Sequence, residues 1–267
     1  MSQPQCGGAL SGDQLYRFFY HMYNDKTELP EKFIPLNEDD LKLYNNKLKV
    51  FYNPENIHIV VVHRGTKLKS NRDVFNNVRN FIAVKNEYLI TYRNLTAKEG
   101  HIELKNFLIK IYRYKDSIKY LRYKSITDYI DRLLKTFKNL TVSDAVDKLL
   151  KRKLSTIGYS QGAVYAYLYG EDGKETLVYN PAPFFEKKPE NTYVVKIEKD
   201  PVSVLNSSKQ IYVLNKKTRS YKEAHSLKHL KNSKRMFGNP TLHTKYNKSK
   251  SRKNKQTKKN VTRKNKK

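Results

Sequence analysis

The chain has 267 residues, one cysteine and a net charge of +29, and this length is sufficient for one well-filled α/β core. A single cysteine excludes an intramolecular disulfide, and the first residues lack the basic and apolar regions of a secretory signal. The longest apolar run, Ile57 to Val62, is far shorter than the ~20 residues that cross a bilayer. These features predict an intracellular protein, cytoplasmic or nuclear, without a transmembrane segment.

The positive charge is concentrated toward the C-terminus. Residues 224–267 contain 16 lysines and arginines and no acidic residue. From Tyr246 onward almost every residue is polar or basic, so this segment cannot bury enough apolar surface to offset the entropy of ordering it. We therefore predict a folded domain over residues 1–237 and a disordered basic tail over residues 238–267. Such a tail suits an anionic membrane surface or a nucleic acid as its partner.

The first half of the chain contains three predicted elements before the principal motif. Residues 12–23 carry apolar side chains at spacings of three and four, which predicts a helix whose aromatic side chains join the core. Residues 57–62 are a β-branched run bounded by turn residues, which is typical of a central strand covered on both faces. Apolar periodicity predicts helix again over residues 118–137 and 142–150, with Ser143 as the cap of the second helix.

The second half of the chain alternates strand and helix patterns. A predicted strand at residues 154–157 precedes a small-residue run at 163–166, and further strands are predicted at 175–179, 192–197 and 210–214. Such alternation predicts an α/β fold with a mostly parallel central sheet and helices on both faces. The sequence lacks paired Cys or His with zinc spacing and a phosphate-binding glycine loop, so we expect neither a metal nor a cofactor.

The motif Gly158-Tyr-Ser-Gln-Gly162 lies between the strand at 154–157 and the run at 163–166. A strand-to-helix turn of this kind is called a nucleophile elbow, and it requires glycine on both sides because the neighbouring backbones lie too close for a Cβ. The turn exposes the Ser160 hydroxyl. The alternative is a simple glycine loop in which Ser160 bonds to backbone.

A serine nucleophile needs a histidine to accept its proton and a carboxylate to orient that histidine. In folds with a nucleophile elbow the chain order is serine, acid, histidine. Asp200 follows the predicted strand at 192–197, where catalytic groups gather, and we prefer it to Asp172, which resembles an exposed turn residue.

His225 is the preferred base among the histidines that follow the candidate acid. His229 lies one helical turn further, and His243 already lies in the basic terminal region. His63 precedes the elbow and so has the wrong chain order. The sequence thus predicts a triad of Ser160, Asp200 and His225.

The negative charge that develops during acyl transfer requires preset hydrogen-bond donors. The backbone N–H of Gln161 is one predicted donor, because it follows the nucleophile. Thr66 is the second, since it follows the early strand and Gly65 allows a close backbone approach. The alternative is that His63 to Thr66 only form a turn at the end of the strand.

Two segments together resemble the class 3, or fungal-lipase-like, family of α/β-hydrolases: Val60-Val-Val-His-Arg-Gly-Thr66 and Ile157-Gly-Tyr-Ser-Gln-Gly-Ala163. Asp200 and His225 follow in the family's order, and the resemblance covers about residues 50–230. It implies an α/β-hydrolase fold and a serine hydrolase that cleaves lipid esters through an acyl-enzyme. It also implies that residues 67–81 are the place for a lid, which many members carry; the alternative for this segment is a fixed surface helix.

The chain departs from the family around the serine, where His and Leu are usual and Tyr159 and Gln161 are found. His63 also stands where Phe is common. Gln161 places a polar group beside the acyl site, which argues against a strict triacylglycerol preference. The rival functions are a basic nucleic-acid-associated protein and a non-catalytic hydrolase-fold interaction module.

Overall fold

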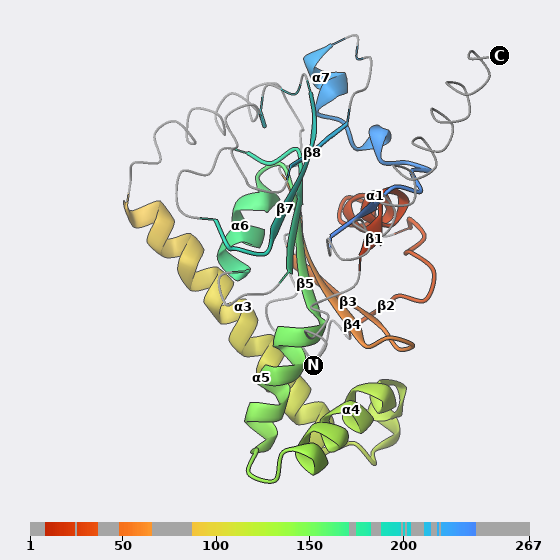
Figure 1. The fold of residues 1–267 in the computed structure, drawn as a ribbon, viewed down its shortest axis with the longest axis vertical. Coiled ribbons are helices and arrows are strands. Elements are labelled where there is room, and N and C mark those ends of the chain that lie inside the picture. Colours follow the sequence, from red (N-terminus) through yellow and green to blue (C-terminus); the bar gives the residue numbers. More distant parts are fainter. Residues whose placement is uncertain are drawn as a thin grey trace, which may run out of the picture.

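The computed structural model describes residues 9–24, 26–36, 48–65, 87–170, 175–182, 188–198, 200, 202–203, 211–214, 218 and 220–238. A seven-stranded sheet forms its centre (Figure 1). Its strands, in spatial order, are β2 (Ile34–Pro35), β3 (Leu48–Asn53), β4 (His58–His63), β5 (Leu154–Tyr159), β6 (Glu175–Tyr179), β7 (Thr192–Ile197) and β8 (Ile211–Leu214). The pairs from β4 to β8 are parallel, and the pairs β2–β3 and β3–β4 are antiparallel.

Helices lie against both faces of the sheet (Figure 1). On one side is α1 (Gly12–His21); on the other are α3 (Glu87–Arg113), α5 (Val142–Lys153) and α6 (Gly162–Tyr169). The remaining helices are the 3₁₀ helix η2 (Ile118–Tyr123), α4 (Lys124–Thr136), α7 (Tyr221–Ala224) and the 3₁₀ helix η3 (Leu227–His229). A separate two-stranded sheet pairs β1 (Leu10–Ser11) with β9 (Met236–Phe237). The prediction of a mixed α/β fold with a mostly parallel sheet is confirmed.

Strand β4 supplies core residues to both faces, as its continuous apolar run predicts. All six of its residues are buried. Ile59 and Val61 join the cluster under α3, α4 and α5, whereas Val60 and Val62 join the cluster under α1. This alternation follows from the two-residue period of a strand, and it fixes β4 beside β5 in the interior of the sheet.

Two details of the predicted helices are wrong. Helix α5 is capped by Thr141, not Ser143, because Thr141 and Asp144 form a reciprocal capping box. The segment predicted as one helix over residues 118–137 begins as the 3₁₀ helix η2 before α4 follows. In a 3₁₀ helix, residues three apart share a face, and here Tyr120 and Tyr123 are the pair that is buried.

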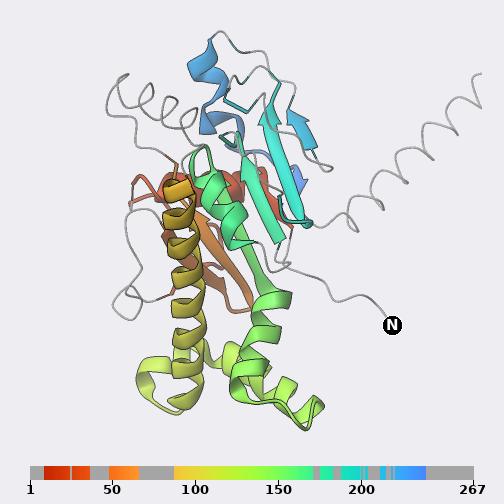
Figure 2. The ribbon, with the colours of Figure 1, turned by 90° about the vertical axis from the view of Figure 1, so that its left-hand side faces the viewer.

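The helices α3, α4 and α5 build a lobe at one end of the molecule. Figure 2 shows α3 running along the sheet and continuing beyond it, with α4 at its far end. Helix α3 is anchored by Leu104, Phe107, Leu108 and Ile111, which are all buried. Strand β5 begins directly after α5, so its carboxyl end points away from this lobe.

Several predictions fall on residues outside the described part of the chain. These are Thr66, Asp172, His243, the predicted lid at residues 67–81 and the predicted tail beyond Gly238. Among the residues that the structure does describe, none of the helices combines the length and apolar character that crossing a membrane requires.

Two histidines are buried in the sheet and held neutral. His58 contacts the Ser155 hydroxyl at 2.8 Å and His63 contacts the Thr156 hydroxyl at 3.1 Å. Burial, with a smaller effect of Lys153 on His58, lowers the pKa of His58 to about 4, and burial lowers the pKa of His63 to about 3. Both values lie below the ordinary value of 6.5, so each ring resists protonation while the chain is folded.

We expect the free energy of unfolding to fall as the pH drops from about 6.5 to about 4.5, because only the unfolded chain binds protons at these histidines in that range. His63→Phe removes one of the two groups and should lower the slope by up to about 1.4 kcal/mol per pH unit. Urea unfolding followed by circular dichroism at several pH values measures the slope. An unchanged slope in the variant would contradict this assignment.

Candidate active site

Ser160 stands at a sharp bend between β5 and α6. Its φ angle is +54°, in the left-handed region that costs a residue with a Cβ about 1–3 kcal/mol. The bend is held by backbone bonds: the Ser160 N–H donates to the Tyr179 carbonyl at 3.1 Å, and the Ser160 carbonyl accepts from Ala163 at 3.1 Å and from Ala182 at 3.0 Å. The strained backbone turns the side chain out of the sheet.

The two motif glycines are required by close backbone contacts. A Cβ on Gly158 would lie 2.4 Å from the Gly162 carbonyl oxygen, and a Cβ on Gly162 would lie 2.3 Å from the His63 carbonyl oxygen. Neither contact can be relieved by moving a flexible side chain. The end of β4 and the start of α6 therefore press together, as the sequence predicts for an elbow.

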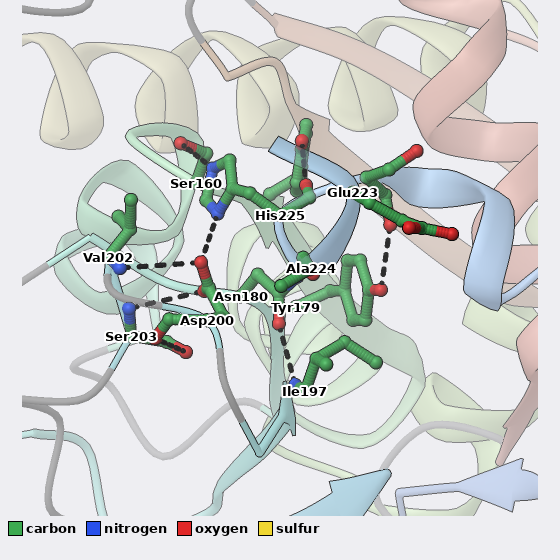
Figure 3. Close-up of polar contacts among 12 residues, drawn as sticks. Ser160, Tyr179, Asn180, Ile197, Asp200, Val202, Ser203, Glu223, Ala224 and His225 are labelled. Atoms are coloured by element: carbon green, nitrogen blue, oxygen red, sulfur yellow. Dashed lines mark hydrogen bonds and ion pairs between the residues drawn. The ribbon is translucent and has the colours of Figure 1, made fainter. Parts of the chain in front are cut away.

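The structure brings the three predicted triad residues together from three separate segments (Figure 3). His225 Nε2 lies 2.8 Å from Ser160 Oγ. His225 Nδ1 lies 2.9 Å from Asp200 Oδ1. Asp200 follows β7, and His225 follows the short helix α7.

The Asp200 carboxylate is buried and accepts hydrogen bonds from the backbone. The residue is 1% exposed. The N–H groups of Val202 and Ser203 donate to its two oxygens at 3.3 Å and 3.2 Å. These bonds orient one oxygen toward His225.

This arrangement fixes the proton positions needed for base catalysis. An ionised carboxylate only accepts hydrogen bonds, so the Asp200 contact assigns the ring proton to His225 Nδ1. Nε2 then has a free electron pair directed at the Ser160 hydroxyl. The His225 imidazole can accept the serine proton while the Asp200 carboxylate stabilises the imidazolium that results.

The loop after β4 lies beside Ser160. A Cβ on Gly65 would lie 2.7 Å from the Tyr159 carbonyl oxygen and 3.2 Å from Ser160 Cβ, so only glycine fits this position. Gln161, the predicted donor that follows Ser160, is the N-cap residue of α6. The predicted partner donor, Thr66, comes directly after Gly65 but lies outside the described residues.

Tyr23 is a neighbour of the site that sequence reasoning missed. Its hydroxyl oxygen is buried and would lie 2.9 Å from a Cβ on Gly65. The guanidinium of Arg64 lies 5.8 Å from the centre of its ring. The helical spacing of residues 12–23 indicated only that Tyr23 lies in the core. No local sequence pattern distinguishes a tyrosine in the core from a tyrosine beside the site.

The alternative histidines bind elsewhere. His229 Nε2 lies 2.7 Å from the Glu223 carbonyl oxygen. His63 is 3% exposed and contacts Thr156. Within the described ranges, three or more His, Cys, Asp or Glu side chains nowhere gather in a way that would hold a metal ion.

A scan against protein-family models gives no match, and a search of curated proteins gives none either.

The contacts of Gly162 predict the effect of a single methyl group. Gly162→Ala should destabilise the protein by about 1–3 kcal/mol or displace the bend, because the new Cβ meets the His63 backbone. Ala163→Gly is the control at the next position: it removes a buried Cβ and adds no contact, so it should cost about 1 kcal/mol of helix propensity and about 0.8 kcal/mol for the lost methyl group, with the bend retained. Thermal unfolding compares the two, and a wild-type melting temperature for Gly162→Ala would contradict the crowding described above.

Proposed function

We propose that this chain is a serine hydrolase with an α/β-hydrolase fold that cleaves carboxylic esters of lipids. The observation that carries the proposal is the continuous line of contacts from Ser160 through His225 to Asp200, at a serine with a positive φ angle. Each group has the partner that nucleophilic catalysis requires.

In the proposed reaction, Ser160 Oγ attacks the ester carbonyl carbon while His225 Nε2 takes the hydroxyl proton. The tetrahedral oxyanion receives hydrogen bonds from the Gln161 N–H and from Thr66. The C–O bond to the alcohol then breaks, and the alcohol leaves with the proton from His225. Water, deprotonated by the same imidazole, hydrolyses the acyl-enzyme and releases the acid.

The lipid-ester class rests on the resemblance to the fungal-lipase-like family, which residues 60–66 and 157–163 carry as its early strand with the oxyanion loop and its elbow. Strands β4 and β5 of this chain are paired, with His63 opposite Gly158. This pairing supports the assignment of the loop after β4 as the oxyanion loop. The buried Asp200 carboxylate, which accepts two backbone hydrogen bonds and contacts His225, favours catalysis over the rival role of a non-catalytic interaction module.

The basic tail is proposed to bring the hydrolase to an anionic surface, either a membrane or a nucleic acid. Residues 239–267 contain 12 lysines and arginines and no acidic residue. Each basic residue near an anionic bilayer contributes about 1 kcal/mol at low ionic strength. An anionic membrane suits a lipid substrate, because binding there raises the local enzyme concentration.

The direct test of the proposed nucleophile is Ser160→Ala. We expect ester hydrolysis to fall by about a million-fold, since the substitution removes the proposed nucleophile that forms the acyl-enzyme. Hydrolysis of a short p-nitrophenyl ester measures the loss, and a fluorophosphonate probe followed by peptide mapping identifies the modified residue.

The control for this substitution is Ser117→Ala, because Ser117 is exposed and its side chain makes no cap hydrogen bond to η2. It should hydrolyse the ester at the wild-type rate. Equal rates for Ser160→Ala and the wild type, or labelling at a residue other than Ser160, would refute the proposed function.

Deleting residues 239–267 should leave hydrolysis of a short soluble ester unchanged. It should weaken binding to anionic liposomes or to nucleic acid, and the difference between the full chain and the deletion should shrink as salt rises. Co-sedimentation at several salt concentrations measures this. Equal binding by both forms would show that the tail is not the anionic-surface anchor.

A further inference from the structure

The segment that carries His225 is held by side chains from the carboxyl ends of two neighbouring strands. The carbonyl oxygens of three consecutive residues, 224 to 226, each accept a side-chain hydrogen bond. The Asn180 amide donates to Ala224 at 2.9 Å (Figure 3), and the Tyr179 hydroxyl donates to Ser226 at 2.9 Å. The Tyr159 hydroxyl donates to the carbonyl of His225 itself.

We propose that Tyr159, Tyr179 and Asn180 form a carbonyl clamp, a set of positioning residues that holds the His225 imidazole between Ser160 and Asp200. The role as a positioning device rests on the proposed hydrolase function. The clamp acts through His225 and does not touch the reacting atoms.

The His225 segment depends on such contacts because its own helices are very short. Helix α7 has four residues and η3 has three. Helices of this length are not stable alone, and the last carbonyls of a helix lack internal partners. The clamp supplies partners to these carbonyls and so determines where the segment lies relative to the sheet.

Tyr159 contacts His225 in two ways. Besides the hydrogen bond to the His225 carbonyl, its ring stacks on the imidazole at 5.3 Å between centroids and 29° between planes. Tyr159 in turn stacks on Tyr179 at 5.9 Å and 27°, and the two tyrosines are partners in the β5–β6 register. The result is a column of three rings that fixes both the backbone and the ring plane of His225.

Both phenols remain donors over the working pH range. Burial raises the pKa of Tyr159 and of Tyr179 well above the ordinary value of 10. A phenol that keeps its proton can donate to a carbonyl, whereas a phenolate would be repelled by it.

Asn180 connects the base segment to the acid segment. Its side-chain oxygen accepts from the Ile197 N–H at 2.9 Å while its amide nitrogen donates to Ala224. Ile197 is the last residue of β7, and the Asp200 N–H donates back to the Ile197 carbonyl at 3.1 Å. One fully buried side chain thereby sets the relative position of the two triad partners of Ser160.

The test removes single hydroxyl groups and keeps the rings. We expect Tyr159→Phe and Tyr179→Phe each to lower kcat for a soluble p-nitrophenyl ester by about 10- to 100-fold, because a displacement of about 1 Å has an effect of that size. KM should change less than about twofold, and the rate of fluorophosphonate labelling at Ser160 should fall in parallel with kcat.

The matched control is Tyr169→Phe. Tyr169 is also buried, and its hydroxyl also donates to a backbone carbonyl, that of Gly100 at 3.3 Å. The control should lose comparable thermal stability but keep the wild-type kcat. Wild-type kcat in both clamp variants, with an active and labelled wild-type protein, would overturn the clamp and leave the hydrolase proposal intact.

A measurement that does not depend on turnover tests the clamp separately from the hydrolase function. Proton and ¹⁵N NMR of histidine-labelled full-length protein reports the Nδ1–H of His225 that bonds to Asp200. We expect a protected resonance in the wild type and in Tyr169→Phe, and a broadened or lost one in Tyr159→Phe and Tyr179→Phe. An identical resonance in all four proteins would refute the clamp, whereas absent esterase activity and labelling in the wild type would refute the hydrolase function alone.

Discussion

The close packing of the β4 end against the bend at Ser160 is the constraint on which the rest of the site depends. The His63 carbonyl leaves no space for a Cβ on Gly162, and the Tyr159 carbonyl leaves none for one on Gly65. These contacts bring the loop after β4 beside Ser160. The same bend gives Ser160 its positive φ angle, and its hydroxyl lies within hydrogen-bond distance of His225.

The parallel strands place the other residues of the site around this bend. The carboxyl ends of β5, β6 and β7 meet at one edge of the sheet, where loops carry functional side chains in α/β folds. Ser160 and Asp200 come from two of these ends, and the clamp comes from β5 and β6. His225 approaches from a later segment and therefore needs the clamp most.

Sequence reasoning was effective where local chemistry is distinctive. The sequence was sufficient to predict the elbow glycines, the apolar strand β4 and the order of Ser160, Asp200 and His225. Each of these depends on neighbouring residues in the chain or on the ends of strands. Long-range contacts left no such signal. Tyr23 and Tyr159 have the spacing of ordinary core or motif residues, and only folding places their hydroxyls beside Gly65 and His225.

Local capping and helix geometry were harder to predict for a different reason. Thr141 and Ser143 are both good caps, and the choice is decided by the reciprocal bond with Asp144. Helix α3, with a mixed polar and apolar sequence, and the short strand β2 gave no periodic pattern strong enough to stand out. Strand β2 pairs with β3, and β3 pairs with β4, both antiparallel. The local sequence of these strands does not indicate which strands pair.

The lobe built by α3, α4 and α5 has a practical consequence for handling the protein. It lies at the end opposite the carboxyl edge of β5 (Figure 2), and Ile118, the first residue of η2, is 88% exposed there. A surface-attachment point or a reporter dye placed in this lobe would leave the edge with Ser160 and His225 free of the attachment. The lobe and the proposed active site thus lie at separate ends of the molecule.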